Sequence, residues 1–240
     1  MTKFLITGGE NADGFQSTSE ILDLSIRGHS YCKDWAEFPK DVLFATGGVV
    51  KDTVIVCGGF NYDIYESVDE CYSLDSKAAT LITHMSAKRA YAASLVIDEK
   101  SLWITGGLNS DIDYILASSE FITLAGSKPG PELPIPLDLH ALVAINNTCS
   151  ILIGGRTSGN VETPTTHYFH HDGNNWIQGP DLIQARRVHA AGIVTDEVTY
   201  EKFVTVTGGE HNGIDLDSTE MLINNQWNQG KISHYYSILV

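Results

Sequence analysis

The stretch Leu102-Trp103-Ile104-Thr105-Gly106-Gly107 decides the fold, because a short apolar run followed by two glycines occurs five times. The five pairs are Gly8-Gly9, Gly58-Gly59, Gly106-Gly107, Gly154-Gly155 and Gly208-Gly209, spaced by 48 to 54 residues. A period of this length indicates one supersecondary unit repeated along the chain. The sequence therefore predicts a repeat architecture that forms a single domain over residues 1–240.

Further landmarks recur around each glycine pair. The apolar runs before the pairs are rich in β-branched and aromatic residues, which is typical of buried strands. An alternating stretch after each pair carries Glu20, Glu70, Glu120 or Glu220, with His167 at the matching place in the fourth unit. A run of small residues precedes each pair and is opened by Phe44, Tyr91, His140, His189 or His234. These stretches, with a short outer strand, predict four antiparallel strands per unit, as in a propeller blade.

The chain resembles the kelch-repeat β-propellers in these landmarks. The matching residues are the glycine pairs, the glutamates with Tyr72 after Glu70 in the second unit, the outer-strand Trp35, Trp176 and Trp227, and the stretch Arg186-Arg187-Val188-His189. The resemblance covers essentially the whole chain and implies an all-β, five-bladed propeller. His167 and the missing tryptophan of units two and three depart from the family pattern, so the packing of those blades is open.

The two ends of the chain predict how the ring closes. Residues 3–9 form the second strand of a blade, whereas residues 234–240 form a first strand without a partner. Pairing these segments would close the first blade and hide both edges. The alternative is a fragment of a larger ring that assembles with another copy. The expected blades are 1–40 with 233–240, 41–87, 88–136, 137–185 and 186–232.

The charge balance narrows the partners. Thirty acidic residues against 15 Lys and Arg give a net charge of −15. Such a chain repels nucleic acid phosphates and anionic membranes. No apolar run approaches the ~20 residues of a membrane helix, so no membrane insertion is expected. The charge suits basic proteins, cations or neutral glycans, or it serves solubility alone.

The cysteines and one asparagine favour an extracellular location over a cytoplasmic one. Cys57 and Cys71 fall on strands that the blade pattern makes neighbours, so a disulfide forms if their Cβ atoms face each other. The alternative is two buried free thiols that pack as small apolar groups. The stretch from Cys32 to Tyr72 is also similar to secreted invertebrate kelch proteins. Asn146-Asn147-Thr148 is a glycosylation sequon at an expected turn.

A binding site is expected on the face where the loops after the glycine pairs meet the connections between blades, because such loops carry function on rigid scaffolds. Three of these loops repeat an Asn-x-Asp pattern, which either ligates calcium or bonds its own backbone in turns. We expect the turns, no metal site and no cofactor. The strand openers are expected to ring a channel mouth on the same face, near the cations Lys88, Arg156, Arg186 and Lys231. The candidate ligand-binding residues are Tyr62, Asp63, Tyr91, Asp111, His140, Arg156, Arg186, His189 and His234.

Two interpretations of this surface compete. A cationic mouth would hold an acidic side chain or a sugar acid, since arginine grips carboxylates with two parallel hydrogen bonds. Alternatively, the histidines and aromatic rings pack between blades and the cations pair with the recurring glutamates. The apolar strands carry no paired carboxylates of the glycosidase kind, and no nucleophile elbow or phosphate loop occurs. We therefore expect a monomeric, non-catalytic scaffold that binds a protein or a glycan, with a sugar-acid enzyme or a self-assembling structural protein as alternatives.

Overall fold

The computed structural model describes residues 3–7, 9–12, 14–23, 31–196, 198–230 and 236–239, and these residues form strands and turns without a helix. Contacts divide the chain into two compact units. Unit 1 comprises Met1–Ile104, Leu108–Tyr114 and Glu120–Gly130, and unit 2 comprises Thr105–Gly107, Ile115–Ser119 and Pro131–Val240. The sequence predicts one domain, but the sheets of a repeat array contact mainly their neighbours, so the contacts separate into two groups.

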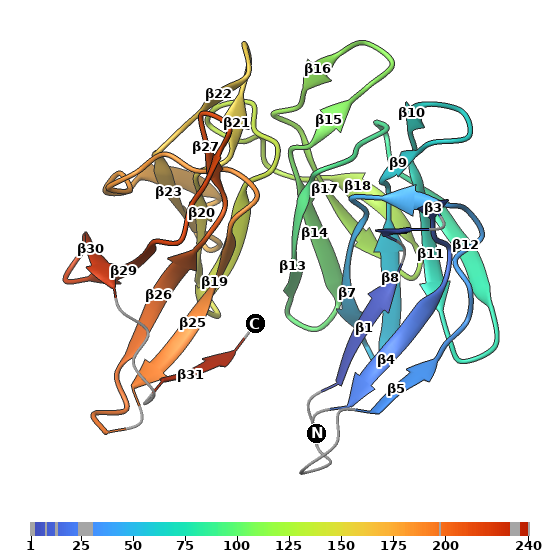
Figure 1. The fold of residues 1–240 in the computed structure, drawn as a ribbon, viewed down its shortest axis with the longest axis horizontal. Coiled ribbons are helices and arrows are strands. Elements are labelled where there is room, and N and C mark those ends of the chain that lie inside the picture. The colour runs from blue at the N-terminus through green and yellow to red at the C-terminus, as the bar shows by residue number, and fades with distance from the viewer. Residues whose placement is uncertain are drawn as a thin grey trace. The chain divides into compact units, whose positions relative to one another are not determined.

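Unit 1 is built from antiparallel sheets that follow the repeat (Figure 1). The first sheet has the order β1-β4-β5, the second β7-β8-β11-β12, and the third β13-β14-β17-β18, whose middle strands run on into unit 2. Their bounds are β1 Lys3–Thr7, β4 Ser19–Asp23, β5 Tyr31–Asp34, β7 Thr46–Val50, β8 Thr53–Cys57, β11 Glu70–Leu74, β12 Ala79–His84, β13 Ala93–Ile97, β14 Ser101–Thr105, β17 Ser119–Thr123 and β18 Gly126–Pro129.

Unit 2 contains the fourth and fifth sheets. The fourth has the order β19-β20-β23-β24, with β19 Ala141–Asn146, β20 Cys149–Ile153, β23 Thr166–His170 and β24 Asn175–Gln178. The fifth has the order β31-β25-β26-β29-β30, with β25 Ala190–Asp196, β26 Lys202–Thr207, β29 Thr219–Ile223, β30 Gln226–Gly230 and β31 Tyr236–Leu239. Each expected range from the second blade to the fifth thus holds four strands of one antiparallel sheet, with a short hairpin between the second and the third of them.

The C-terminal strand differs from the prediction. The sequence predicts that it pairs with residues 3–9, but β31 pairs antiparallel with β25, where Ile193 faces Leu239 and Asp196 faces Tyr236. The first sheet therefore consists of β1, β4 and β5. An apolar strand is stabilised by any sheet edge that offers free backbone groups, and the edge of β25 offers them as well as β1 does.

Apolar side chains fill the space between neighbouring sheets within each unit. In unit 1, Ile55 and Leu102 belong to one buried cluster that joins the second and third sheets. Gly48 on β7 makes this contact close, because a Cβ there would lie 2.7 Å from a methyl of Val96. In unit 2, Ile151 and Val206 belong to the corresponding cluster between the fourth and fifth sheets.

Several of the doubled glycines, Gly106 and Gly155 among them, are required by close packing as well as by backbone conformation. Gly106 and Gly155 have φ of +60° and +99°. A Cβ on Gly106 would lie 2.2 Å from the Leu137 carbonyl oxygen, and one on Gly155 would lie 2.6 Å from the Cβ of His140. Since side chains rarely tolerate either condition, glycine is needed where each hairpin meets the next connection between sheets.

The disulfide between Cys57 and Cys71 is present, as predicted. The two residues are directly paired partners on β8 and β11, and both are fully buried. The bond closes a short loop, for which the chain-entropy model gives a stabilisation of about 3 kcal/mol. It therefore reinforces the second sheet, which carries the surface described below.

Candidate binding surface

Two loops of unit 1 are joined side by side by serine hydrogen bonds. The first contains β9 Phe60–Asn61 and β10 Glu66–Ser67, and the second contains β15 Leu108–Asn109 and β16 Tyr114–Ile115. The Ser67 amide donates to the Ser110 hydroxyl at 2.6 Å, and the Ser110 amide donates to the Ser67 hydroxyl at 3.2 Å. This reciprocal pair holds the loops in one arrangement before any ligand arrives.

Lys88 adds an ionic connection between the same loops. Its ammonium lies 2.6 Å from Glu66 on the first loop and 2.7 Å from Asp111 on the second. The hydrogen bonds to Asp111 and Glu66 raise the pKa of Lys88. Asp111 is thus part of the expected site, but it serves to fix the loops, and Lys88 adds no uncompensated positive charge to the surface.

Aromatic rings gather on the first loop. Phe60, Tyr62 and Tyr65 contact one another edge to face, with centroids 4.9 to 5.7 Å apart. Tyr65 is 72% exposed, and Ile64 beside it is 55% exposed. On the second loop, Ile112 and Tyr114 are also exposed. Large apolar groups left in water on rigid loops are typical of a contact surface for a partner.

A second aromatic pair stands where the first strands of the second and third sheets begin. The rings of Phe44 and Tyr91 stack with centroids 4.1 Å apart, and the Tyr91 amide donates to the Phe44 carbonyl at 3.1 Å. Both residues have positive φ, 59° and 58°, a conformation that is costly for residues other than glycine. We call the surface formed by Phe44, Tyr91 and the loops 60–67 and 108–114 the unit 1 platform.

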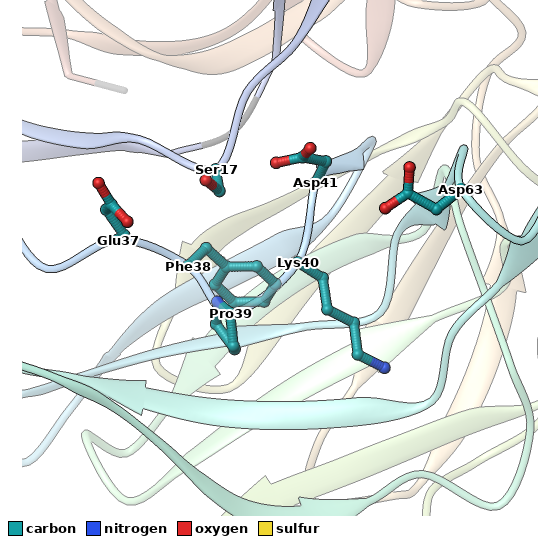
Figure 2. A pocket seen from close by; sticks show the side chains of 7 residues that line it. All are labelled: Ser17, Glu37, Phe38, Pro39, Lys40, Asp41 and Asp63. Carbon is teal, nitrogen blue, oxygen red and sulfur yellow. The ribbon is translucent and has the colours of Figure 1, made fainter.

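An acidic pocket of about 420 Å³ opens at Asp63 (Figure 2). Its lining is Ser17, Glu37, Phe38, Pro39, Lys40, Asp41 and Asp63. In Figure 2 the side chain of Lys40 extends away from the carboxylates of Asp41 and Asp63, and its ammonium pairs with Glu70 instead. Within the described residues, Glu37, Asp41 and Asp63 have no cationic partner. The pocket thus presents negative charge above the buried Phe38.

The arginines of unit 2 do not form the expected cationic mouth. Arg186 is fully buried; it donates to Glu220 at 2.8 Å and to the Gly208 carbonyl at 2.8 Å. The prediction that Arg186 binds a ligand is therefore wrong, because its charge is neutralised by Glu220 of the fifth sheet. Arg156 is near the surface, but its Nε donates to the buried Asp138 at 2.9 Å and its Nη1 to Asn160 at 3.0 Å. The alternative in which the cations pair with the recurring glutamates describes Arg186, whereas Arg156 pairs with Asp138, which is not one of those glutamates.

His140 and the ring nitrogens of His189 are buried rather than exposed at a rim. His140 contacts Thr105 Oγ1 through Nε2 at 2.9 Å, and its buried Nδ1 has no partner among the residues that the structure describes. Burial and the neighbouring His189 lower the pKa of His140 to about 3. His189 is partly exposed as a residue, but both ring nitrogens are buried; burial and Arg186 lower its pKa to about 4. Neutral, enclosed rings of this kind pack; they do not bind a ligand from solvent.

The error in the predicted rim is one of register. The positions equivalent to Phe44 and Tyr91 are Leu139 and Val188, with φ of 54° and 55°, and the histidines follow one residue later. The Val188 amide donates to the Leu139 carbonyl at 3.1 Å, as Tyr91 does to Phe44. This position is identified by its backbone conformation with positive φ, and not by an aromatic or histidine side chain. His234 lies outside the described residues.

Tyr62, Asp63, Tyr91 and Asp111 of the predicted set meet on or beside the unit 1 platform. The sequence indicates Tyr65 as an exposed aromatic anchor of its loop, but the predicted site omits Phe60, Glu37 and Asp41. The aromatic spacing Phe60-x-Tyr62-x-x-Tyr65 was a usable signal for Phe60, since it repeats a large ring within one turn-rich loop. The pocket had no such signal, because its lining comes from three separate segments.

The Asn-x-Asp pattern forms turns where the structure describes it fully. Asn61 Oδ1 accepts from the Asp63 amide at 2.8 Å, and Asn109 Oδ1 accepts from the Asp111 amide at 3.1 Å. Such Asx turns shape the loops and occupy the oxygen that a cation would need. Among the described side chains, no three His, Cys, Asp or Glu groups converge as metal ligands do. The same part of the chain contains no helix able to cross a membrane.

Comparisons with known proteins bear on the fold alone. No family profile matches the sequence, and no curated protein matches it. The structure is similar to that of YjhT, with a TM-score of 0.80 over 95% of this chain and 80% of that chain, at 14% sequence identity. A likeness at this identity establishes the all-β architecture of antiparallel sheets and carries no conclusion about the ligand.

Proposed function

We propose that this protein is a non-catalytic binding scaffold, a five-bladed kelch-like β-propeller that recognises a protein or glycan partner through the unit 1 platform. The observation that carries the proposal is the exposure of Tyr65 and Ile112 on loops that are already fixed, with Phe44 exposed at the start of the second sheet. Preorganised loops lose little conformational entropy on binding, so exposed rings on them contribute efficiently to affinity.

Charge favours a protein partner with basic and apolar side chains. The pocket beside the platform carries Glu37, Asp41 and Asp63, while Lys88 and Lys40 are paired with carboxylates. A lysine or arginine of a partner would meet uncompensated negative charge there and aromatic faces on the platform. The same charges repel acidic ligands, so they disfavour a sugar acid as the ligand.

The alternative functions have less support. A sugar-acid enzyme required positive charge at the channel mouth, and the two arginines expected there are paired with Asp138 and Glu220. A self-assembling structural role would use the same exposed rings between copies. Light scattering separates this case, since a stable monomer at working concentration removes it.

The test is a binding survey with matched variants. The purified chain is screened against an array of synthetic peptides that vary in basic and apolar content, and against a glycan array. We expect basic, aromatic-rich peptides to bind, and Tyr65→Ala or Ile112→Ser to weaken the best of them by about tenfold. Leu81→Ser is the control, because Leu81 on β12 is as exposed as Phe44 and lies outside the platform.

Three results would count against the proposal. Equal loss of binding for Leu81→Ser and Tyr65→Ala would show that general surface hydrophobicity is responsible. Binding that does not weaken with added salt would contradict the role of the pocket carboxylates. Turnover of a sugar acid by the unmodified chain, lost in an Asp138→Asn variant, would favour the enzyme instead.

A further inference from the structure

Asn146 is the single asparagine of the 240-residue sequence that has serine or threonine two positions after it. The triplet Asn146-Asn147-Thr148 is the acceptor pattern for N-linked glycosylation when it is exposed in a secreted protein. We propose that Asn146 carries an N-linked glycan. The proposal does not depend on the binding function, because it concerns unit 2 and a different part of the chain.

The local geometry presents the acceptor amide to solvent. Asn146 ends β19 and pairs with Cys149 at the start of β20, so Asn147 and Thr148 form a two-residue hairpin turn. All three residues of the triplet are exposed. A glycan attached here displaces no packed side chain, and loop tips of this kind tolerate large additions.

Hydrogen bonds hold the amide oxygen and leave the amide nitrogen available. Asn146 Oδ1 accepts from the Thr148 amide at 2.8 Å and from the Thr148 hydroxyl at 3.0 Å. Among the described residues, no group bonds the nitrogen Nδ2 of Asn146. The Thr148 hydroxyl therefore holds the carboxamide by its oxygen and leaves the reacting nitrogen without a competing hydrogen bond in the described part of the chain.

The disulfide indicates a compartment in which this reaction takes place. Cys57 and Cys71 are linked, and such bonds persist in the oxidising secretory pathway and outside the cell. The secretory pathway is also where oligosaccharides are transferred to asparagine. The cysteines and the acceptor triplet are independent features that favour the same location.

The donor class follows from the chemistry of the bond. Asn146 Nδ2 forms a bond to the anomeric carbon of an oligosaccharide carried on a polyprenyl diphosphate. The bond between that carbon and the diphosphate oxygen breaks, the lipid diphosphate leaves with the electron pair, and Nδ2 loses one proton to a base of the transferase. No oxidation or reduction is involved.

The position keeps the glycan away from the loop that follows the glycine pair in the same sheet. β20 runs from Cys149 to Ile153, and the loop with β21 Arg156–Thr157 follows from its other end. Asn146 lies at the Cys149 end of this strand. A glycan on Asn146 therefore leaves the loop with β21 uncovered.

The test is expression of the chain with a secretion leader in eukaryotic cells, with intact-mass measurement of both the secreted and the retained protein. We expect a series of masses that peptide-N-glycosidase collapses to one, with the acceptor asparagine converted to aspartate. Asn146→Gln and Thr148→Ala should abolish the added mass. Asn147→Gln is the matched control, since it alters the same turn but keeps the acceptor triplet, and it should retain the glycan.

The retained protein makes the outcome independent of secretion yield. An unmodified mass in both fractions would overturn the proposal. Added mass that resists the glycosidase, or that persists in both Asn146→Gln and Thr148→Ala, would assign the modification elsewhere and would also overturn it. Loss of platform binding leaves these results unchanged, so failure of the proposed function is distinguishable.

Discussion

The fourth and fifth sheets of unit 2 share one backbone plan but differ in what stabilises their centres. In the fifth sheet, Glu220 accepts from the buried Arg186 at 2.8 Å and from the Ile183 amide at 2.7 Å. In the fourth sheet, His167 occupies the place of the glutamate and Leu137 that of the arginine. The equivalence is set by the backbone, since the Gly107 amide donates to Leu137 and the Gly155 amide to Arg186.

A third substitution accompanies these two. Leu133 and Leu182 make the same backbone hydrogen bond at 2.8 Å, so Pro134 is equivalent to Ile183. Proline has no amide hydrogen and cannot donate to a carboxylate. In the fifth sheet the Gln184 amide also donates to Glu220, at 3.1 Å, and its equivalent in the fourth sheet is Ile135. The fourth sheet therefore lacks the cation and one of the two backbone donors, so a buried carboxylate there would have no counter-charge. His167 is a consistent replacement, because burial lowers its pKa and keeps it neutral.

The third sheet, in unit 1, supports the same rule. Glu120 accepts from the buried Arg89 at 2.9 Å and from the Ser86 amide at 2.9 Å. In the second sheet, where Pro39 and Val42 replace the donor and the arginine, Glu70 is less buried and pairs with Lys40. In these sheets the recurring glutamate is thus found together with a buried arginine or a lysine that pairs with it.

The largest effect is expected from breaking the set in the fifth sheet. Glu220→Ala leaves Arg186 buried without its counter-charge and should lower the free energy of unfolding by about 3 to 5 kcal/mol in urea. His167→Ala in the fourth sheet should cost only about 1 kcal/mol. The double change Arg186→Leu with Glu220→His copies the fourth sheet and should recover most of the loss. Equal costs for the two alanine variants would refute the comparison.

Acid should destabilise the fourth and fifth sheets through the histidine with a buried ring just before the first strand of each, His140 and His189. His140 and His189 have a pKa near 6.5 when unfolded and about 3 and 4 in the fold. Folding lowers both pKa values. The stability that the neutral, buried rings contribute is therefore complete above pH 6.5 and is lost as the pH falls toward 4. Each histidine should reduce the free energy of unfolding by about 1.4 kcal/mol per pH unit in this window.

Urea titrations between pH 7 and 4.5 measure this dependence. Replacement of both residues, His140→Gln with His189→Gln, should flatten the curve relative to the unmodified chain. Carboxylate protonation contributes in both proteins and cancels in the difference. A curve of the same slope in the variant would show that the two imidazoles are not buried in neutral form.

A smaller effect is expected from installing the glutamate in the fourth sheet. His167→Glu should lower the free energy of unfolding by about 2 kcal/mol, since the partly buried carboxylate has no counter-charge and lacks the donor that Pro134 cannot supply. Adding Leu137→Arg should recover about 1 kcal/mol through a favourable coupling. Recovery stays partial because Pro134 supplies no amide hydrogen. A double-mutant cycle measured in urea without any coupling would show that the positions are not equivalent in packing.

The smallest effect concerns the strained openers of the two sheets. Val188 is β-branched and has a φ of 55°, whereas Leu139 has 54° and no branch at Cβ. Val188→Asn should stabilise the protein by about 1 kcal/mol, because asparagine tolerates the left-handed conformation. Leu139→Asn should gain less, since leucine is less strained there and partly buried. A larger unfolding midpoint for Leu139→Asn than for Val188→Asn would reverse this ranking.

The sequence was sufficient for features that repeat. Glycine pairs, apolar runs and alternating stretches predicted four antiparallel strands per repeat. The strand order made Cys57 and Cys71 neighbours, and the structure decided between a disulfide and two free thiols. The prediction placed Tyr62, Asp63 and Asp111 correctly in loops. It failed for Arg186, because whether an arginine faces solvent or a buried glutamate depends on a partner that is 34 residues away in the chain.

Local composition determined which segments are strands, since the period of apolar residues and the need for glycine at positive φ act within a few residues. The register of His140 and His189, the pairing of β31 with β25, and the pocket at Asp63 depend on contacts between segments far apart in sequence. These contacts arise only when sheets pack, because burial and hydrogen bonding compare all available partners at once. The tertiary structure therefore decided which charges are neutralised and which rings stay in water.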